Sequence, residues 1–95
     1  VYGANLVGAN VTRTNLANTD LRGTILRLVN LCDRDLSGRD LRGIDLSGAN
    51  LSGANLSRAN LSGANLRYAD VTGAITTHAN LSGADLHGAI GYDGP

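Results

Sequence analysis

The chain has 95 residues, enough for one domain at most, and hydrophobic residues make up 42% of it, which excludes full disorder. It contains no Lys, Glu, Phe, Met or Trp, so this narrow alphabet excludes an ordinary mixed α/β enzyme core. The eight Asp and eight Arg residues give a net charge of zero, which favours neither nucleic acid nor an acidic membrane surface as a partner. The single cysteine, Cys32, excludes an internal disulfide, and no apolar run is long enough to span a membrane.

An internal repeat of five residues fills the chain. Between Asn50 and Leu66 the sequence reads NLSGANLSRANLSGANL, and units centred on Leu continue in both directions, giving eighteen units from Ala4 to Asp93. The residue before each centre is almost always Asn or Asp, the residue two before it is mostly Ala, and the residue two after it is mostly Gly. Tandem units of this kind indicate a solenoid.

A period of five fits neither a helix nor a simple strand. A helix would spread the leucines around its circumference, and a long strand would send them to alternate faces. A short extended step followed by a turn, repeated, would point every centre to one axis, and Asn, Asp and Gly tolerate the turns. We therefore predict an all-β coil whose core consists of Leu6, Leu16, Leu21, Leu26, Leu31, Leu36, Leu41, Leu46, Leu51, Leu56, Leu61, Leu66, Leu81 and Leu86.

These Ala-Asn/Asp-Leu-x-Gly units resemble the pentapeptide-repeat family over essentially the whole chain. The resemblance implies a right-handed quadrilateral parallel β-helix with one unit per side, twenty residues per coil and about four and a half coils. It implies a single domain over residues 1–95, with regular units over 4–93.

An irregular segment, 25–44, interrupts the regular pattern. Leu28 takes the place of a turn Gly and is predicted to be exposed, while Arg34 and Arg39 take the small inward position. A guanidinium in a leucine-lined axis is costly unless it is paired. Three readings stay open: the backbone bulges so that both arginines reach solvent, both lie half inside and pair with nearby Asp residues, or the segment is a partner contact.

Stacking at twenty residues also predicts a mild basic strip on two adjacent sides. Arg27 and Arg67 share one column of side chains, and Arg22 and Arg42 share the neighbouring column. The strip is either a solvated surface or a weak site for an anionic partner. The candidate contact residues are therefore Arg27, Leu28, Arg34, Arg39 and Arg67.

At the end of the chain the repeat decays through Ile90 and Gly91. Tyr92 would either cover the axis or form an end-to-end contact with a second copy, giving a homodimer. The sequence begins inside a repeat, which we interpret as a segment of a longer protein or as a chain whose end docks on a second copy.

We expect a non-enzymatic structural or protein–protein interaction module with an unidentified protein partner. We expect no cofactor, metal or catalytic residue, no direct nucleic-acid contact and no membrane contact, because a leucine-filled axis leaves no substrate cavity. The alternative is inhibition or protection of DNA gyrase by DNA mimicry, which the family resemblance implies, although the zero net charge departs from it. The compartment is open: cytoplasm is favoured, and periplasm or thylakoid lumen are alternatives.

Overall fold

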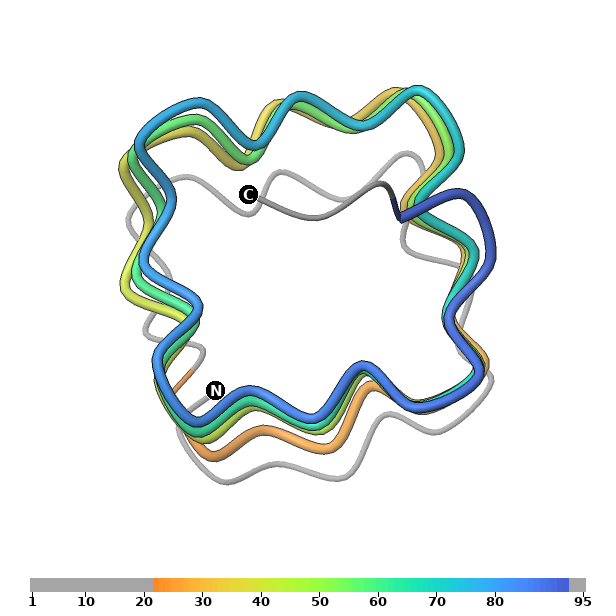
Figure 1. Cartoon of the computed structure of the whole chain (residues 1–95), viewed down its shortest axis with the longest axis horizontal. Helices are drawn as coiled ribbons and strands as arrows, with labels where there is room; N and C mark the ends of the chain where they lie inside the picture. Colours follow the sequence, from red (N-terminus) through yellow and green to blue (C-terminus); the bar gives the residue numbers. More distant parts are fainter. Residues whose placement is uncertain (1–21, 93–95) are drawn as a thin grey trace.

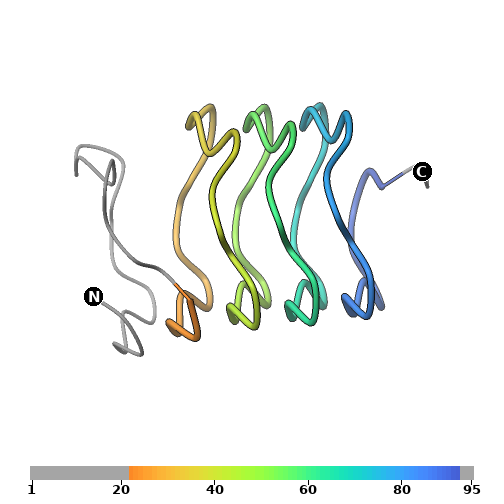
Figure 2. The same cartoon turned by 90° about the vertical axis from the view of Figure 1, so that its left-hand side faces the viewer.

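The computed structural model describes residues 22–92, which run round a four-sided coil (Figure 1) and stack along a single axis (Figure 2). Within this range there is no helix and no continuous strand. The β-structure consists of ten isolated parallel bridges, each joining a residue to the one twenty positions later, from Ile25↔Asp45 to Asp70↔Ile90. Twenty residues therefore make one coil, and each side of the coil is one five-residue unit. We number the sides from the units 24–28 (side 1), 29–33 (side 2), 34–38 (side 3) and 39–43 (side 4), which recur every twenty residues.

A tight turn ends each unit. The N–H of Ala54 donates to the carbonyl of Leu51 at 3.0 Å, and the same bond recurs from unit to unit. The third residue of each turn has a φ between 59° and 72°, as in a type II turn, and Gly is the residue that adopts this conformation without steric cost. Other residues occupy five of these left-handed positions, namely Leu28, Asp33, Arg58, Tyr68 and His78.

The Asn or Asp before each centre holds the start of the turn. The Oδ1 atom of Asn50 accepts the backbone N–H of Ser52 at 3.0 Å and the Ser52 hydroxyl at 2.7 Å. Ten further units contain the same backbone bond, which is the Asx-turn interaction. This bond explains the preference for a short polar acceptor at this position, and the units of Ile25, Ile75 and Ile90 lack it because Ile has no side-chain oxygen.

The axis of the coil is filled by the centre leucines. Leu26, Leu31, Leu36, Leu41, Leu46, Leu51, Leu56, Leu61 and Leu66 are at most 2% exposed, whereas Leu81 and Leu86 are half-buried against them. Burying each leucine contributes about 1.5–3 kcal/mol. Tyr92 also packs against this core, and the cavity left inside the axis near it is only about 10 Å³. The predicted core residues Leu6, Leu16 and Leu21 lie outside the described residues.

The irregular segment 25–44 keeps the register of the coil. The N–H groups of Arg34 and Arg39 donate to the carbonyls of Leu31 and Leu36 at 3.2 and 3.3 Å, and their own carbonyls accept from Asn55 and Asn60 in the next coil. The reading in which the backbone bulges is therefore wrong: both arginines are half-buried on a regular path, and both have interaction partners. A long aliphatic stem makes this compatible with an inward position, since it can lie against apolar surface.

Candidate functional site

Two large apolar side chains stand out from side 1. Leu28 is 67% exposed, as predicted, and Tyr68, two coils further along the same side, is 57% exposed. Leu28 lies over Gly48, where an added Cβ would come within 2.7 Å of the Leu28 Cδ2 atom. The Tyr68 ring lies over Gly88 in the same way. The glycines twenty residues later therefore leave the space that these two side chains occupy.

Neither Leu28 nor Tyr68 suits its backbone conformation. Their φ angles are 63° and 60°, and the left-handed conformation costs an L-residue roughly 1–2 kcal/mol. On side 4 the same positions are Gly in every described coil. Exposed apolar residues held in a strained conformation are typical of functional positions more than of stabilising ones.

A shallow groove of about 360 Å³ lies between the two side chains. Arg27, Leu28, Ser47, Gly48 and Tyr68 line it, and most of its lining is apolar. It is open to solvent, so it suits a side chain of another protein better than an enclosed substrate.

The arginines beside the groove are neutralised by aspartates of the next coil. Arg27 Nε lies 3.5 Å from an Asp45 carboxylate oxygen, and Arg67 Nη1 lies 3.2 Å from one of Asp85. The pKa of Arg67 is raised, first by its hydrogen bond with Asp85 and then by Tyr68. On side 4, Arg42 is paired with Asp40 at 2.7 Å. The prediction of a basic strip is therefore wrong in electrostatic terms, because three of its arginines are paired with carboxylates.

Aromatic contacts hold the Tyr68 end of the groove in place. The guanidinium of Arg67 lies 5.7 Å from the centre of the Tyr68 ring, and the His87 ring meets Tyr68 edge-on at a centroid distance of 5.7 Å. Such contacts contribute about 0.5–1.5 kcal/mol each. They place a tyrosine and an arginine together at one end of an apolar groove.

Side 1 thus brings together three of the predicted contact residues: Arg27, Leu28 and Arg67. Arg34 and Arg39 lie on sides 3 and 4 and do not join them. Tyr68 was missed by the sequence reasoning. The sequence signal for Tyr68 is that it replaces a turn Gly forty residues after Leu28. This distance is two coils, so both residues lie at the same corner.

Several aspartates of the turns titrate below their ordinary range. The Ser37 hydroxyl lowers the pKa of Asp35, the Arg42 side chain lowers the pKa of Asp40, and the backbone N–H of His87 lowers that of Asp85. These carboxylates are therefore ionised and engaged in local turns at neutral pH.

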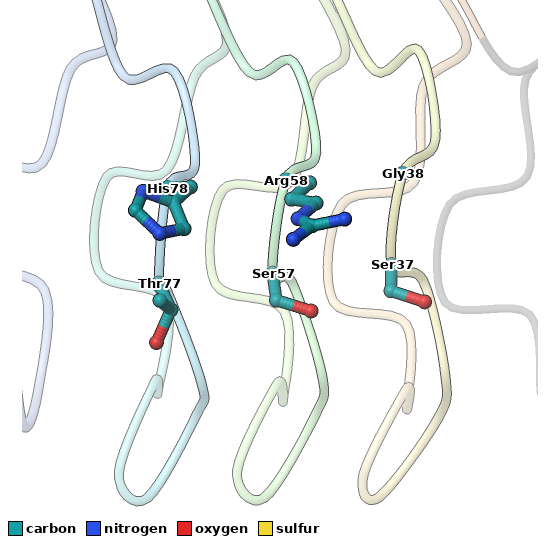
Figure 3. A pocket seen from close by; sticks show the side chains of 6 residues that line it. All are labelled: Ser37, Gly38, Ser57, Arg58, Thr77 and His78. Carbon is teal, nitrogen blue, oxygen red and sulfur yellow. The ribbon is translucent and has the colours of Figure 1, made fainter.

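A second groove, of about 570 Å³, lies on side 3, opposite side 1. It is lined by Ser37, Gly38, Ser57, Arg58, Thr77 and His78 (Figure 3). Residues 22–92 contain no group of three or more His, Cys, Asp or Glu side chains able to hold a metal ion. Over the same range we find no helix long and apolar enough to cross a membrane.

A five-residue unit repeated in register through a stacked coil defines a class of tandem-repeat proteins. The model of the pentapeptide-repeat family matches residues 2–33, 40–77 and 64–90, with eight copies of the repeat. The chain belongs to the pentapeptide-repeat family. No curated protein matches it in a sequence search.

Solved structures of the same family resemble the coil. The pentapeptide-repeat protein Rfr23 from the cyanobacterium Cyanothece 51142 is 28% identical, with a TM-score of 0.65 over 93% of this chain and 88% of that one. HetL from Nostoc sp. strain PCC 7120, involved in heterocyst differentiation regulation, is 36% identical (TM-score 0.50, 98% of this chain and 45% of HetL). QnrB1, a plasmid-mediated fluoroquinolone resistance protein, is 26% identical (TM-score 0.50, 73% of this chain and 43% of QnrB1). The chain therefore spans less than half of the latter two proteins.

Proposed function

We propose that this protein is a non-enzymatic interaction module that docks a partner protein on side 1. The observation that carries the proposal is the pair Leu28 and Tyr68, exposed and strained at the same corner with a groove between them. We also infer that residues 1–95 form one domain and that its coil is right-handed, as in the family.

The chemistry of side 1 supports a protein partner. Tyrosine and arginine are enriched among the residues that dominate binding at interfaces, and an apolar pocket between them accepts an anchoring side chain. Leu28 and Tyr68 supply the apolar walls, Arg27 also lines the groove, and Arg67 lies by the Tyr68 ring; the charges of both arginines are balanced by aspartates. A partner that inserts an apolar side chain fits this surface better than a polyanion.

Arg34 and Arg39 remain a second proposed contact, and they are less favourable. Both are half-buried and already engaged, so a partner would have to compete with their present interactions. Replacing both by Ala, the residue found directly above them at Ala54 and Ala59, leaves side 1 intact. We expect partner binding to persist in this variant.

DNA mimicry is less well supported than docking on side 1. A mimic needs a continuous acidic surface, but the described Asp residues before the centres are interrupted by Asn or Ile in every column. Asp40, Asp45 and Asp85 are also paired with arginines. We expect no inhibition in a gyrase supercoiling assay at micromolar protein, and dose-dependent inhibition without DNA binding would favour mimicry instead.

Site-specific photo-crosslinking tests the docking proposal. A photoreactive phenylalanine analogue is placed at position 28 or 68 on side 1, or at position 43 or 63 on side 4, and the protein is incubated with a lysate of the organism that encodes it. We expect one product that forms from positions 28 and 68 only and that is lost when the other side-1 residue is replaced by Gly. Equal crosslinking from side 4, or a product insensitive to these replacements, would refute docking on side 1.

A further inference from the structure

The second groove contains an arginine whose guanidinium has no hydrogen-bond or ion-pair partner among the described residues. In residues 22–92, Arg27, Arg42 and Arg67 form ion pairs, and Arg22, Arg34 and Arg39 have other partners. Arg58 is the arginine of this range whose side chain has no hydrogen bond or ion pair. Its five N–H donors face solvent on side 3.

The repeat pattern explains why the Arg58 guanidinium has no carboxylate partner. On side 1 each arginine pairs with an Asp of the following coil, as Arg27 does with Asp45 and Arg67 with Asp85. The equivalent column of side 3 reads Asp35, Asn55 and Ile75. No carboxylate therefore follows Arg58 in the next coil.

The same column leaves a second set of donors free. Because Ile75 has no side-chain oxygen, the backbone N–H and the hydroxyl of Thr77 have no acceptor, whereas the equivalent N–H of Ser57 donates to Asn55. Thr77 lies on the coil next to Arg58, whose backbone N–H donates to the Thr77 carbonyl at 2.9 Å. Residues with free donors of two kinds, Arg58 and Thr77, therefore lie in adjacent coils and line the same groove.

Two residues that line this groove have a strained, left-handed backbone conformation. Arg58 and His78 have φ angles of 62° and 59°, in successive coils at one corner, and neither side chain has a hydrogen bond, ion pair or ring contact within residues 22–92 that offsets the cost. In Figure 3 the Arg58 guanidinium extends toward the coil of Ser37 and Gly38, in the direction away from His78. Arg58 is exposed, and exposed side chains change rotamer within nanoseconds, so its guanidinium can turn toward Thr77 when an anion binds.

We propose that side 3 binds a single oxyanion, a phosphate or carboxylate group, between the Arg58 guanidinium and the N–H and hydroxyl donors of Thr77. Charge-assisted hydrogen bonds from a guanidinium to such groups are short and strong. The Asp35 carboxylate accepts the Ser37 N–H and hydroxyl at 3.0 and 2.7 Å, so it adds a negative charge next to Ser37, which lines the groove in the coil before Arg58. It disfavours an extended polyanion such as nucleic acid and limits the site to one anionic group at the Thr77 end. The proposal is independent of docking on side 1.

Nuclear magnetic resonance of the whole chain tests the site. Sodium phosphate and sodium acetate are titrated separately at neutral pH, against sodium chloride of matched ionic strength. We expect saturable chemical-shift changes of the Thr77 amide and of the Arg58 Nε–H with millimolar phosphate. The acetate titration tests whether a carboxylate binds as well as a phosphate. Saturation by both anions assigns a carboxylate or a phosphate as the ligand, and saturation by phosphate alone assigns phosphate.

Matched variants distinguish specific anion binding at this site from a general effect of ionic strength. Arg58→Gly installs the residue that its turn prefers and should weaken phosphate binding about tenfold, which is the loss of one charge-assisted contact. Thr77→Val removes the hydroxyl and should weaken it less. Arg42→Ser removes an arginine from side 4 and should leave binding unchanged. Linear shifts with both anions, or equal affinity in Arg58→Gly and the natural protein, would overturn the proposal.

Discussion

The Cδ2 atom of Leu28 lies over Gly48 of the next coil, so close that a Cβ on Gly48 would be 2.7 Å away from it. Tyr68 and Gly88 repeat the relationship at the same corner, two coils further along the axis. A large side chain at this corner therefore depends on a glycine twenty residues later. The alternation of Leu28, Gly48, Tyr68 and Gly88 along this corner forms the groove on side 1. Gly48 is therefore required for two reasons: its backbone is left-handed, and the Leu28 side chain lies over it.

Replacing Gly48 by Ala should destabilise the protein more than replacing Gly43 by Ala. Both glycines have a φ of 67°, so both variants carry the strain of a left-handed Ala, about 1 kcal/mol. Only Gly48→Ala also displaces Leu28, because an added Cβ on Gly43 would meet nothing within 4 Å. Urea denaturation measures the difference, and it should vanish in a Leu28→Gly background. A difference that persists there would show that Leu28 is not its cause.

Replacing Arg58 by Gly should stabilise the protein. The change removes left-handed strain, offset in part by the greater entropy of Gly in the unfolded chain, for a net gain of about 0.5–1 kcal/mol. Arg58→Ala is the control, since it removes the same side chain and keeps the strain, and it should bring no gain. Thermal denaturation of the two variants decides the matter: equal melting temperatures would mean that the backbone at position 58 is not strained.

Truncating a centre leucine should cost more in the middle of the coil than near its described end. Leu51 is fully buried, and Leu51→Ala should lower the free energy of unfolding by about 2–5 kcal/mol. Leu86 is half-buried, and Leu86→Ala should cost about 1–2 kcal/mol, since less apolar surface is lost. The reverse order in chemical denaturation would contradict the packing described for the axis.

Stability should fall as the solution is acidified. The folded-state pKa values of Asp35, Asp40 and Asp85 are lowered, so these groups bind fewer protons in the folded than in the unfolded state. Their contribution is present above the unfolded pKa of about 3.9 and is lost as the pH falls through the folded values. Melting temperatures should therefore drop below about pH 4. Replacing all three by Asn keeps the turn acceptor and should flatten this dependence; an unchanged slope would assign it to other groups.

Much of the fold could be predicted from local features of the sequence. The five-residue period places leucines such as Leu46 and Leu51 on one axis, and the preference for Asn and Asp matches the bond that the Ser52 N–H donates to the Asn50 Oδ1 atom. The coil length came from the family resemblance, and the bridges at twenty residues agree with it. These features repeat in nearly every unit, so one unit predicts the next.

The candidate site was harder to predict because it depends on contacts between coils. The ion pair of Arg27 and Asp45 joins residues eighteen positions apart, and it neutralises what the sequence suggested was a basic strip. Tyr68 becomes part of the groove only when its distance from Leu28 is counted in coils. Arg34 suggested a bulge, but its backbone bonds remain regular, since a long side chain can adapt without moving the main chain.

The central claim is that Leu28 and Tyr68 are kept for docking and not for stability, and the free energy of unfolding of the double variant Leu28→Gly/Tyr68→Gly tests it most directly. Glycine relieves the strain at both turns while the contacts over Gly48 and Gly88 are lost, so we predict stability within about 1 kcal/mol of the natural protein or above it. A loss of about 3 kcal/mol or more would mean that both side chains stabilise the fold, and it would contradict the claim.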